Sequence, residues 1–289
     1  MSSRSLFVGM VTHARSRFNV DGVAAGLARS LADEATSLGL ATELLVSDRD
    51  DYNPDTMPIR RSTLVRSAIH QASLEHRWRR YLADGGASAR NAVGDGLAMA
   101  GMAGKRVVAS LGDSGFKAAV RLVNIDLSHL RIMTAALAAH SDWVLVLEDD
   151  AGIDDVAMTA RQLAWLIEAL EPTDVAFASL SQSLALDELG VSGLLSPATD
   201  FDVPAELGLG LMRASRPITN TVCATLYRAS YLSVLRSSIL EHGLVPIAPI
   251  DWRVNEAIMD LYAAGALDSQ SCVWASPGIV LQRSMHDAA

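Results

Sequence analysis

Three consecutive carboxylates, Glu148, Asp149 and Asp150, directly follow the apolar run at residues 143–147. An apolar run of this length, with β-branched and aromatic members, predicts a short, buried strand of a parallel sheet. Ligands of open α/β sheets bind at the carboxyl ends of such strands. Adjacent carboxylates there repel one another unless cations or hydrogen-bond donors compensate their charge. The residues alone fit a solvated acidic turn or a site where Mg²⁺ or Mn²⁺ carries a phosphorylated ligand.

A helix is expected immediately before this strand, because apolar residues recur at helical spacing between residues 127 and 137. The helix contains the adjacent residues Ser128 and His129. Neighbouring residues of a helix project about 100° apart. We therefore expect one of the two side chains to face the acidic strand end or a ligand, and the other to pack or cap locally.

This combination of a Ser-His helix, a hydrophobic strand and a terminal Glu-Asp-Asp resembles the signature of glycosyltransferase family 25, the lipopolysaccharide-type galactosyltransferases. A later block is also similar. Residues 220–235, with the sequence NTVCATLYRASYLSVL, fit a strand that ends in an aromatic residue and a short helix, and Asp251 then follows in the segment PIAPIDW. The resemblance covers residues 120–289, whereas the amino-terminal third departs from the family's usual opening.

The resemblance implies a GT-A fold, an α/β architecture with a Rossmann-like, mostly parallel sheet flanked by helices. It also implies a metal-dependent hexosyltransferase that moves a sugar from a nucleotide diphosphate sugar to a hydroxyl of a glycan or glycolipid precursor. The family inverts the anomeric centre, and the residues themselves leave retention open. The Glu-Asp-Asp element corresponds to the Asp-x-Asp motif of GT-A enzymes, so Asp150 is expected to bind Mn²⁺ or Mg²⁺. Glu148 and Asp149 are expected to orient the ribose, the metal's waters or the sugar hydroxyls.

Two late residues complete the expected site. GT-A transferases commonly return a late His or Asp to the metal, which assigns this role to His286, with Asp287 as a competitor. A residue so near the end of the chain also fits a frayed terminus. Asp251 is our candidate for the general base on the acceptor hydroxyl, and it equally fits the N-cap of the helix that follows. The adjacent Trp252 fits either an apolar surface on which a sugar ring packs or a residue of the hydrophobic core.

The amino-terminal half predicts a βαβ unit. Residues 6–11 fit a buried strand, residues 42–46 fit a second strand, residues 20–38 fit the helix between them, and Gly39 fits the position after its end. This order predicts parallel strands joined by a right-handed crossover. No G-x-G-x-x-G follows the first strand, so a dinucleotide cofactor is disfavoured. We expect a single domain over residues 1–289, with a nucleotide-binding half at 1–150 and an acceptor-binding half at 151–289.

Polar residues follow both strands of this unit at the expected ligand edge of the sheet. The candidates for binding the nucleotide sugar are Thr12, His13, Arg15 and Arg17 after the first strand and Asp48 after the second. Arginines at this place suit phosphate oxygens or a base, and the alternative is that they are ordinary solvated loop residues. Asp48 suits a ribose or base.

The stretch at residues 76–81 mixes cations with aromatic residues. It fits contact with an anionic acceptor or a peripheral membrane contact. It also fits an amphipathic helix in which Trp78 and Tyr81 pack inward while the arginines stay in water. The Gly- and Ala-rich stretch at 85–104 is expected to be a mobile loop.

The charge balance of 24 basic and 33 acidic residues, a net charge of −9, argues against a general nucleic-acid-binding surface. Cys223 and Cys272 are the only cysteines, and their apolar or small neighbours suit reduced, buried thiols, with a disulfide as the alternative.

No apolar run reaches the roughly 18 residues of a membrane span, and no signal-peptide pattern opens the chain. We expect a cytoplasmic protein.

Two other classes of protein also carry strand-end acids. A nucleotidyltransferase would hold a metal and a nucleoside triphosphate in this way, but it usually has a Gly-rich loop with a Lys after the first strand, and lysine is scarce here. A non-catalytic nucleotide-sugar-binding protein would keep the acids and lack a functional base.

Overall fold

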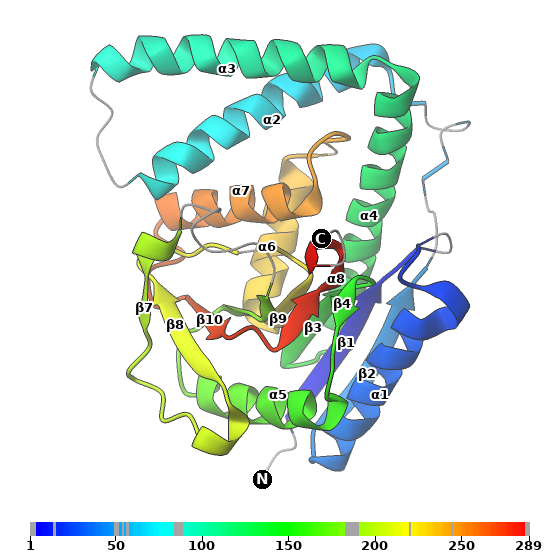
Figure 1. Ribbon diagram of the computed structural model, residues 1–289, viewed down its shortest axis with the longest axis vertical. Helices are drawn as coiled ribbons and strands as arrows, with labels where there is room; N and C mark the ends of the chain where they lie inside the picture. The colour runs from blue at the N-terminus through cyan, green and yellow to red at the C-terminus, as the bar shows by residue number, and fades with distance from the viewer. Residues whose placement is uncertain are drawn as a thin grey trace.

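The computed structural model of this chain describes residues 4–13, 16–48, 52–53, 55, 58–83, 89–182, 191–219, 221–243 and 245–286. Side chains are described for these residues except 89–98 and 285–286. Strands and helices alternate over much of the chain, and helices cover both faces of a central sheet (Figure 1). The chain is therefore an α/β protein.

The eight strands of the central sheet have the order β2-β1-β3-β9-β5-β10-β8-β7. Their bounds are β1 Ser5–Val11, β2 Ala41–Ser47, β3 Trp143–Glu148, β5 Phe177–Ser179, β7 Leu195–Pro197, β8 Gly210–Ala214, β9 Ala224–Arg228 and β10 Cys272–Ser276. β1 runs parallel to both β2 and β3, and β5 runs parallel to β10. β9 is antiparallel to β3 and β5, and β8 is antiparallel to β10 and β7.

The sheet is therefore mixed, and the expected parallel pairing holds for β2-β1-β3 and for β5-β10 but not for the other neighbouring strands. An apolar run shows that a strand is buried, but it does not specify the direction in which the strand pairs. The segment 220–235 does form the expected strand and helix, β9 followed by α6, but β9 enters the sheet in the reverse direction between β3 and β5.

Helices cover each face of the sheet (Figure 1). Their bounds are α1 Val23–Ser37, α2 Arg61–Leu82, α3 Ala89–Ser110, α4 Asp113–Ala138, α5 Val156–Leu170, α6 Ala229–Glu241, α7 Ile250–Ala263 and α8 Arg283–His286. α2 and α3 lie outside α7 (Figure 1). α1 and α5 share one apolar core with alternate residues of the strands, and α4, α6 and α7 share the other. On β3, for example, Leu145 and Leu147 belong to the first core and Val144 and Val146 to the second. Both faces of the strand are buried, which explains its unbroken apolar run.

The amino-terminal βαβ unit has the predicted form. A short 3-10 helix, Val20–Gly22, precedes α1, and Gly39 has a positive φ of 92° after the helix end. Gly9 on β1 lets α4 approach the sheet closely, because a Cβ atom there would lie 2.2 Å from Cγ2 of Ile132. This approach brings the carboxyl end of β1 next to the middle of α4.

A second, smaller sheet ties the acidic turn to the carboxyl-terminal segment. β4 (Ala151–Gly152) pairs antiparallel with β11 (Val280–Gln282), and β11 pairs in parallel with β6 (Ser181–Gln182). α8 follows β11 directly. The residues just after Asp150 are therefore fixed in space by a segment about 130 positions later in the sequence.

The stretch expected to be a mobile loop is largely helical. Residues 89–104 belong to α3, which packs along α2, and residues 84–88 lie outside the described residues (Figure 1). Its alanines and methionines are strong helix formers and outweigh the glycines, each of which costs about 1 kcal/mol relative to Ala. The prediction of a loop from the glycine content of this segment was therefore wrong.

The stretch at 76–81 lies on α2 and forms the expected amphipathic face. Trp78 lies edge-on to Trp252 with 6.0 Å between ring centroids, and Tyr81 meets Tyr262 at 5.5 Å. Arg79 and Arg80 are exposed. Trp252 therefore packs between helices at this point.

Both cysteines, Cys223 and Cys272, are buried and form no disulfide. Among the described residues, no helix has the length and apolar character that a bilayer crossing requires.

Candidate active site

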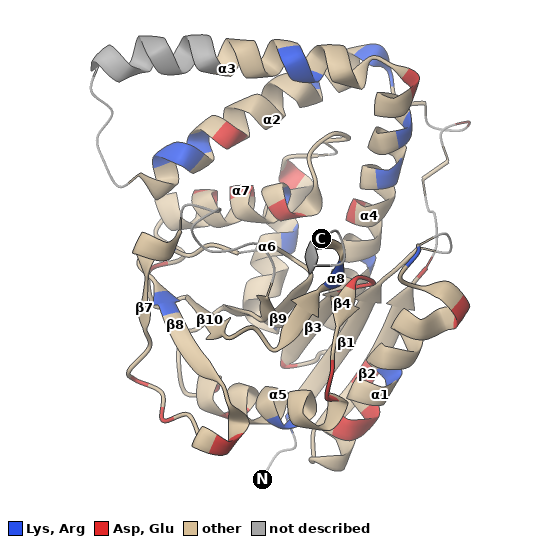
Figure 2. Ribbon diagram, in the orientation of Figure 1, with Lys and Arg blue, Asp and Glu red and all other residues tan. Residues whose placement is uncertain are grey.

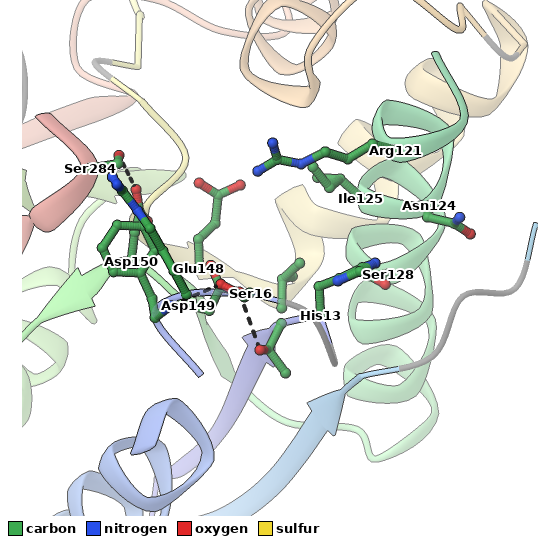
Figure 3. A pocket seen from close by; sticks show the side chains of 14 residues that line it. His13, Ser16, Arg121, Asn124, Ile125, Ser128, Glu148, Asp149, Asp150 and Ser284 are labelled. Atoms are coloured by element: carbon green, nitrogen blue, oxygen red, sulfur yellow. Dashed lines mark hydrogen bonds between the residues drawn. The ribbon is translucent and has the colours of Figure 1, made fainter. Parts of the chain in front are cut away.

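A cavity of about 590 Å³ lies at the carboxyl ends of β1 and β3, with α4 as its other wall (Figure 3). It brings together seven of the residues that the sequence singled out. These are Thr12, His13, Arg17, Ser128, Glu148, Asp149 and Asp150. The cavity therefore lies at the edge of the sheet where open α/β proteins bind ligands.

The three acids have different surroundings. Glu148 is the last residue of β3, and Asp149 and Asp150 form the turn that leads into β4. Oδ2 of Asp149 accepts a hydrogen bond of 3.3 Å from the hydroxyl of Thr12. Oδ2 of Asp150 accepts bonds from Nε2 of Gln282, at 3.2 Å, and from the hydroxyl of Ser284. The end of β11 and the start of α8 thus supply the donors that hold Asp150.

The other carboxylate oxygen of Asp150 has no such partner. Asp150 is only 7% exposed, and its Oδ1 is buried without a donor in hydrogen-bond geometry in the described part of the chain. Oε1 of the neighbouring Gln282 is in the same state. The buried thiol of Cys223 lies beside the Asp150 carboxylate, since burial, the charge of Asp150 and a side-chain hydrogen bond to it raise the pKa of the thiol. Unpaired buried oxygens are costly, and a divalent cation or its water ligands would satisfy them.

A complete metal site is not preformed within the described residues. No group of three His, Cys, Asp or Glu side chains there is arranged to hold a metal ion. The backbone of His286 ends α8, but its side chain lies outside the described residues, as does Asp287. Mg²⁺ commonly uses one or two carboxylates and completes its coordination with waters and substrate phosphates. Asp150, with its unpartnered oxygen, fits that kind of site.

Ser128 and His129 meet the expectation only in part, because one of them contacts the acidic strand end but the other also faces the site and does not merely pack or cap locally. His129 is buried, and its Nε2 lies 3.1 Å from Oε1 of Glu148, within hydrogen-bond distance. Ser128 lines the cavity. α4 therefore contributes one side chain that holds the acidic strand end and one that faces the ligand space.

A buried ion pair lies one turn of α4 before His129. The guanidinium of Arg253 donates to Oδ2 of Asp126, and both residues are almost fully buried. Burial raises the pKa of Asp126 to about 6, against the opposing effects of Arg253 and of His129. Arg253 also donates to the carbonyl of Ile239 at the end of α6, at 2.8 Å. The pair joins α4, α6 and α7 behind the cavity.

Asp251 is not the N-cap of its helix. Pro249 occupies that position, no side chain caps the helix, and Asp251 is the second residue of α7. The capping interpretation is therefore wrong, because the helix begins at Ile250, two residues earlier than an N-cap at Asp251 would require. Burial raises the pKa of Asp251 to about 6, and the charge of Glu148 adds to this effect, while its own backbone N–H and His129 oppose it. Asp251 does not line the cavity but lies within electrostatic range of its acidic edge.

The two strand-end loops contribute unequally. His13 and Arg17 line the cavity, and the guanidinium of Arg17 lies 4.6 Å from the ring centroid of Phe18. Arg15 lies outside the described residues. Asp48 is exposed and does not line the cavity. Ser47, one residue earlier, contacts the loop after β1: its carbonyl accepts a hydrogen bond of 3.0 Å from the N–H of Thr12.

Residues of α4 and the carboxyl-terminal segment were missed by the sequence analysis. Arg121, Asn124 and Ile125 line the cavity from α4, and Ser284 lines it from α8. In Figure 3, Arg121 reaches from α4 into the space in front of the acids. Arg121, Ile125 and Ser128 have helical i, i+4, i+7 spacing, so this face could have been found by extending the Ser-His helix backward. Nothing in the local sequence marks Gln282 or Ser284 as partners of Asp150.

Comparison with known proteins gives no assignment, since no protein-family model and no curated protein sequence matches the chain.

Proposed function

We propose that this chain is a metal-dependent glycosyltransferase of the GT-A type, which transfers a hexosyl group from a nucleotide diphosphate sugar to a hydroxyl of a glycan or lipid-linked acceptor. The observation that carries the proposal is the unpartnered, buried Oδ1 of Asp150 on the wall of a cavity at the strand ends. The same cavity holds two further acids and the cations Arg17 and Arg121. Such a mixture of charges suits a diphosphate bound together with a cation.

The fold gives this proposal a second support. The parallel β2-β1-β3 unit ends at the acids, and the acidic turn continues into a separate small sheet. A GT-A assignment requires a nucleotide-binding α/β half whose strand end carries the acidic motif. The absence of a G-x-G-x-x-G after β1 fits a site where side chains and a metal, and not a glycine-rich turn, hold the phosphates.

Within this proposal the chain's own residues have distinct tasks. Asp150 would hold Mn²⁺ or Mg²⁺, with His286 as a proposed second ligand. When bound, the cation supplies charge neutralisation at the departing diphosphate. Arg17 and Arg121 pair with phosphate oxygens from the opposite walls. Thr12 fixes Asp149, and His129 fixes Glu148, so both acids are held toward the donor.

Asp251 is the proposed general base. An acceptor hydroxyl has a pKa far above neutral and needs a carboxylate that takes its proton as the new bond forms. The raised pKa of Asp251, about 6, makes it a stronger base than an ordinary carboxylate while leaving it mostly ionised at neutral pH. Inversion is part of the proposal, since a single base opposite the leaving group suffices for it.

The first test measures donor binding and donor hydrolysis, because neither needs the acceptor to be known. We expect a nucleoside diphosphate to raise the melting temperature only with Mn²⁺ or Mg²⁺, and a nucleotide diphosphate sugar to be slowly hydrolysed. Asp150→Asn should abolish both effects and keep the fold, since it removes a charge and no core volume. Asp154→Asn, an exposed change in the following loop, is the matched control.

Other outcomes assign the site differently. Metal-dependent binding without hydrolysis or transfer would identify a non-catalytic binding protein. Turnover of a nucleoside triphosphate with a sugar phosphate would identify a nucleotidyltransferase. Unchanged metal-dependent binding in Asp150→Asn would contradict the metal assignment.

A further inference from the structure

Positive charge is concentrated in one part of this acidic chain. Residues 60–121 contain eleven of the 24 basic residues and only four of the 33 acidic ones, so this stretch is positive while the rest of the chain is strongly negative. It comprises α2, α3 and the first turns of α4, which form the outer helical layer beyond α7 (Figures 1 and 2). Charge segregation of this kind produces a local field that attracts anions.

Among the residues whose side chains are described, most of these cations have no carboxylate partner. Within the described residues, Arg77 pairs with Glu256 and Asp260, and Arg106 pairs with Glu75. The exposed cations of this stretch without such a pair in the described part of the chain are Arg60, Arg61, Arg66, Arg79, Arg80, Lys105, Lys117 and Arg121. Arg60 and Arg61 begin α2, where the helix dipole disfavours positive charge. Helix stability therefore does not explain their presence.

Exposed apolar side chains lie among these cations. Ile69 of α2 is 52% exposed, Val108 of α3 is 76% exposed and Leu111 after α3 is 42% exposed. Arg106, near the end of α3, pairs with Glu75 in the second half of α2. The two helices pack along each other, and the start of α2 lies by the end of α3, where α4 also begins (Figure 1). We call this region the basic corner and define it by Arg61, Arg66, Lys105, Ile69, Val108 and Leu111. Asp113 is the exposed acid beside it.

We propose that the basic corner docks on an anionic lipid surface. Cations attract the headgroups, and exposed apolar side chains enter the boundary between headgroups and acyl chains. A nucleic acid would instead be expected to use aromatic side chains for stacking on its bases. The aromatic residues of α2, Trp78 and Tyr81, are turned inward against Trp252 and Tyr262. A symmetric dimer formed through this corner would bring like charges together.

α4 connects this surface to the cavity. Lys117 and Ser128 lie on the same helix, eleven residues apart, which corresponds to about 16 Å along the helix axis. A hydroxyl acceptor embedded in the surface would be presented within reach of the cavity. The docking itself is independent of the proposed transfer reaction, and it is measured without donor or metal, so either inference can fail alone.

The test is sedimentation of the full chain with lipid vesicles at several salt concentrations. We expect binding to vesicles that contain phosphatidylglycerol, little binding to pure phosphatidylcholine, and a decline as salt screens the charges. Each cation near such a surface contributes about fivefold in affinity. Arg66→Glu/Lys105→Glu should therefore weaken binding about twentyfold or more. Arg29→Glu/Arg161→Glu, the same change on exposed residues of α1 and α5, should not.

A separate variant tests the exposed apolar side chains of the basic corner. Val108→Ser should weaken binding at constant charge, whereas Val20→Ser, at a residue 59% exposed elsewhere, should leave it unchanged. Circular dichroism of each variant checks that the fold is kept. Failure to bind phosphatidylglycerol vesicles, equal losses in the two charge variants, or corner-dependent binding of RNA in place of vesicles would each overturn the proposal.

Discussion

Asp251 carries its carboxyl group where burial and the charge of Glu148 both oppose ionisation. Its pKa of about 6 lies above the ordinary 3.8, so the folded chain holds this proton more tightly than the unfolded chain does. The carboxylate therefore destabilises the fold at neutral pH, by up to about 3 kcal/mol. A group retained at such a cost is typical of an active site, where function and stability conflict.

Asp251→Asn should accordingly raise the free energy of unfolding at pH 7.5 and abolish transfer. The gain should shrink as pH falls through 6 and disappear below about 4, where both states of the wild-type residue are protonated. Urea denaturation at several pH values measures the gain. Asp174→Asn, at an exposed acid, is the control. Lower stability at pH 7.5, or wild-type turnover with the acceptor, would contradict the assignment of Asp251 as a desolvated base.

At the scale of elements, Asp126 and Arg253 fasten three helices behind the cavity. Arg253 bonds Asp126 of α4 and the carbonyls of Ile239 and Gly243 at the end of α6. Replacing one member of a buried pair leaves the other charge unpaired, which costs about 3–5 kcal/mol. The pair positions α4, and α4 carries His129 and Ser128 to the cavity.

Arg253→Leu should therefore lower the free energy of unfolding by about 3–5 kcal/mol at pH 7.5. Part of this loss should return at acidic pH, because protonation of Asp126 removes the uncompensated charge. The double variant Asp126→Leu/Arg253→Leu should be clearly less destabilised than the single one. Denaturant titrations of the two variants provide the comparison, and an equal loss in both would show that the pair matters through packing alone.

The sequence predicted those elements whose signal is local. The βαβ unit, the Ser-His helix and the acidic strand end were all correct, because apolar periodicity and strand length fix them. Asp150 was placed at the cavity, yet its partners Gln282 and Ser284 come from a distant strand that no local pattern links to it. The direction of β9 depends on tertiary packing, which an apolar run does not specify. The helical state of α3 was missed because its glycines were given more weight than its strongly helix-forming alanines and methionines.

At the scale of the whole molecule, the α2–α3 layer is attached to the α/β body partly through a polar cluster around Glu256. This buried carboxylate of α7 lies 2.9 Å from Nε2 of His70 and 3.3 Å from the guanidinium of Arg77, both on α2. The pKa of Glu256 is lowered. Burial acts to raise it, and the hydrogen bond and charge of His70, with the charges of His242 and Arg77, outweigh that effect. Its contribution to stability is therefore present above the ordinary glutamate pKa and is lost as pH falls through the lowered value.

α3 packs against α2 and α4, with few contacts to the rest of the chain. We expect the α2–α3 layer to open at lower free energy than the sheet, since local opening follows the density of buried contacts. Hydrogen exchange should then be faster over residues 61–82 and 99–110 than over β1, β3 and β9. Glu256→Gln should accelerate exchange in α2 and α3 at pH 7.5 while β3 remains protected, because it removes the charge that holds Arg77 and His70. Exchange that accelerates equally in β3 would show that the layer and the sheet unfold as one cooperative unit.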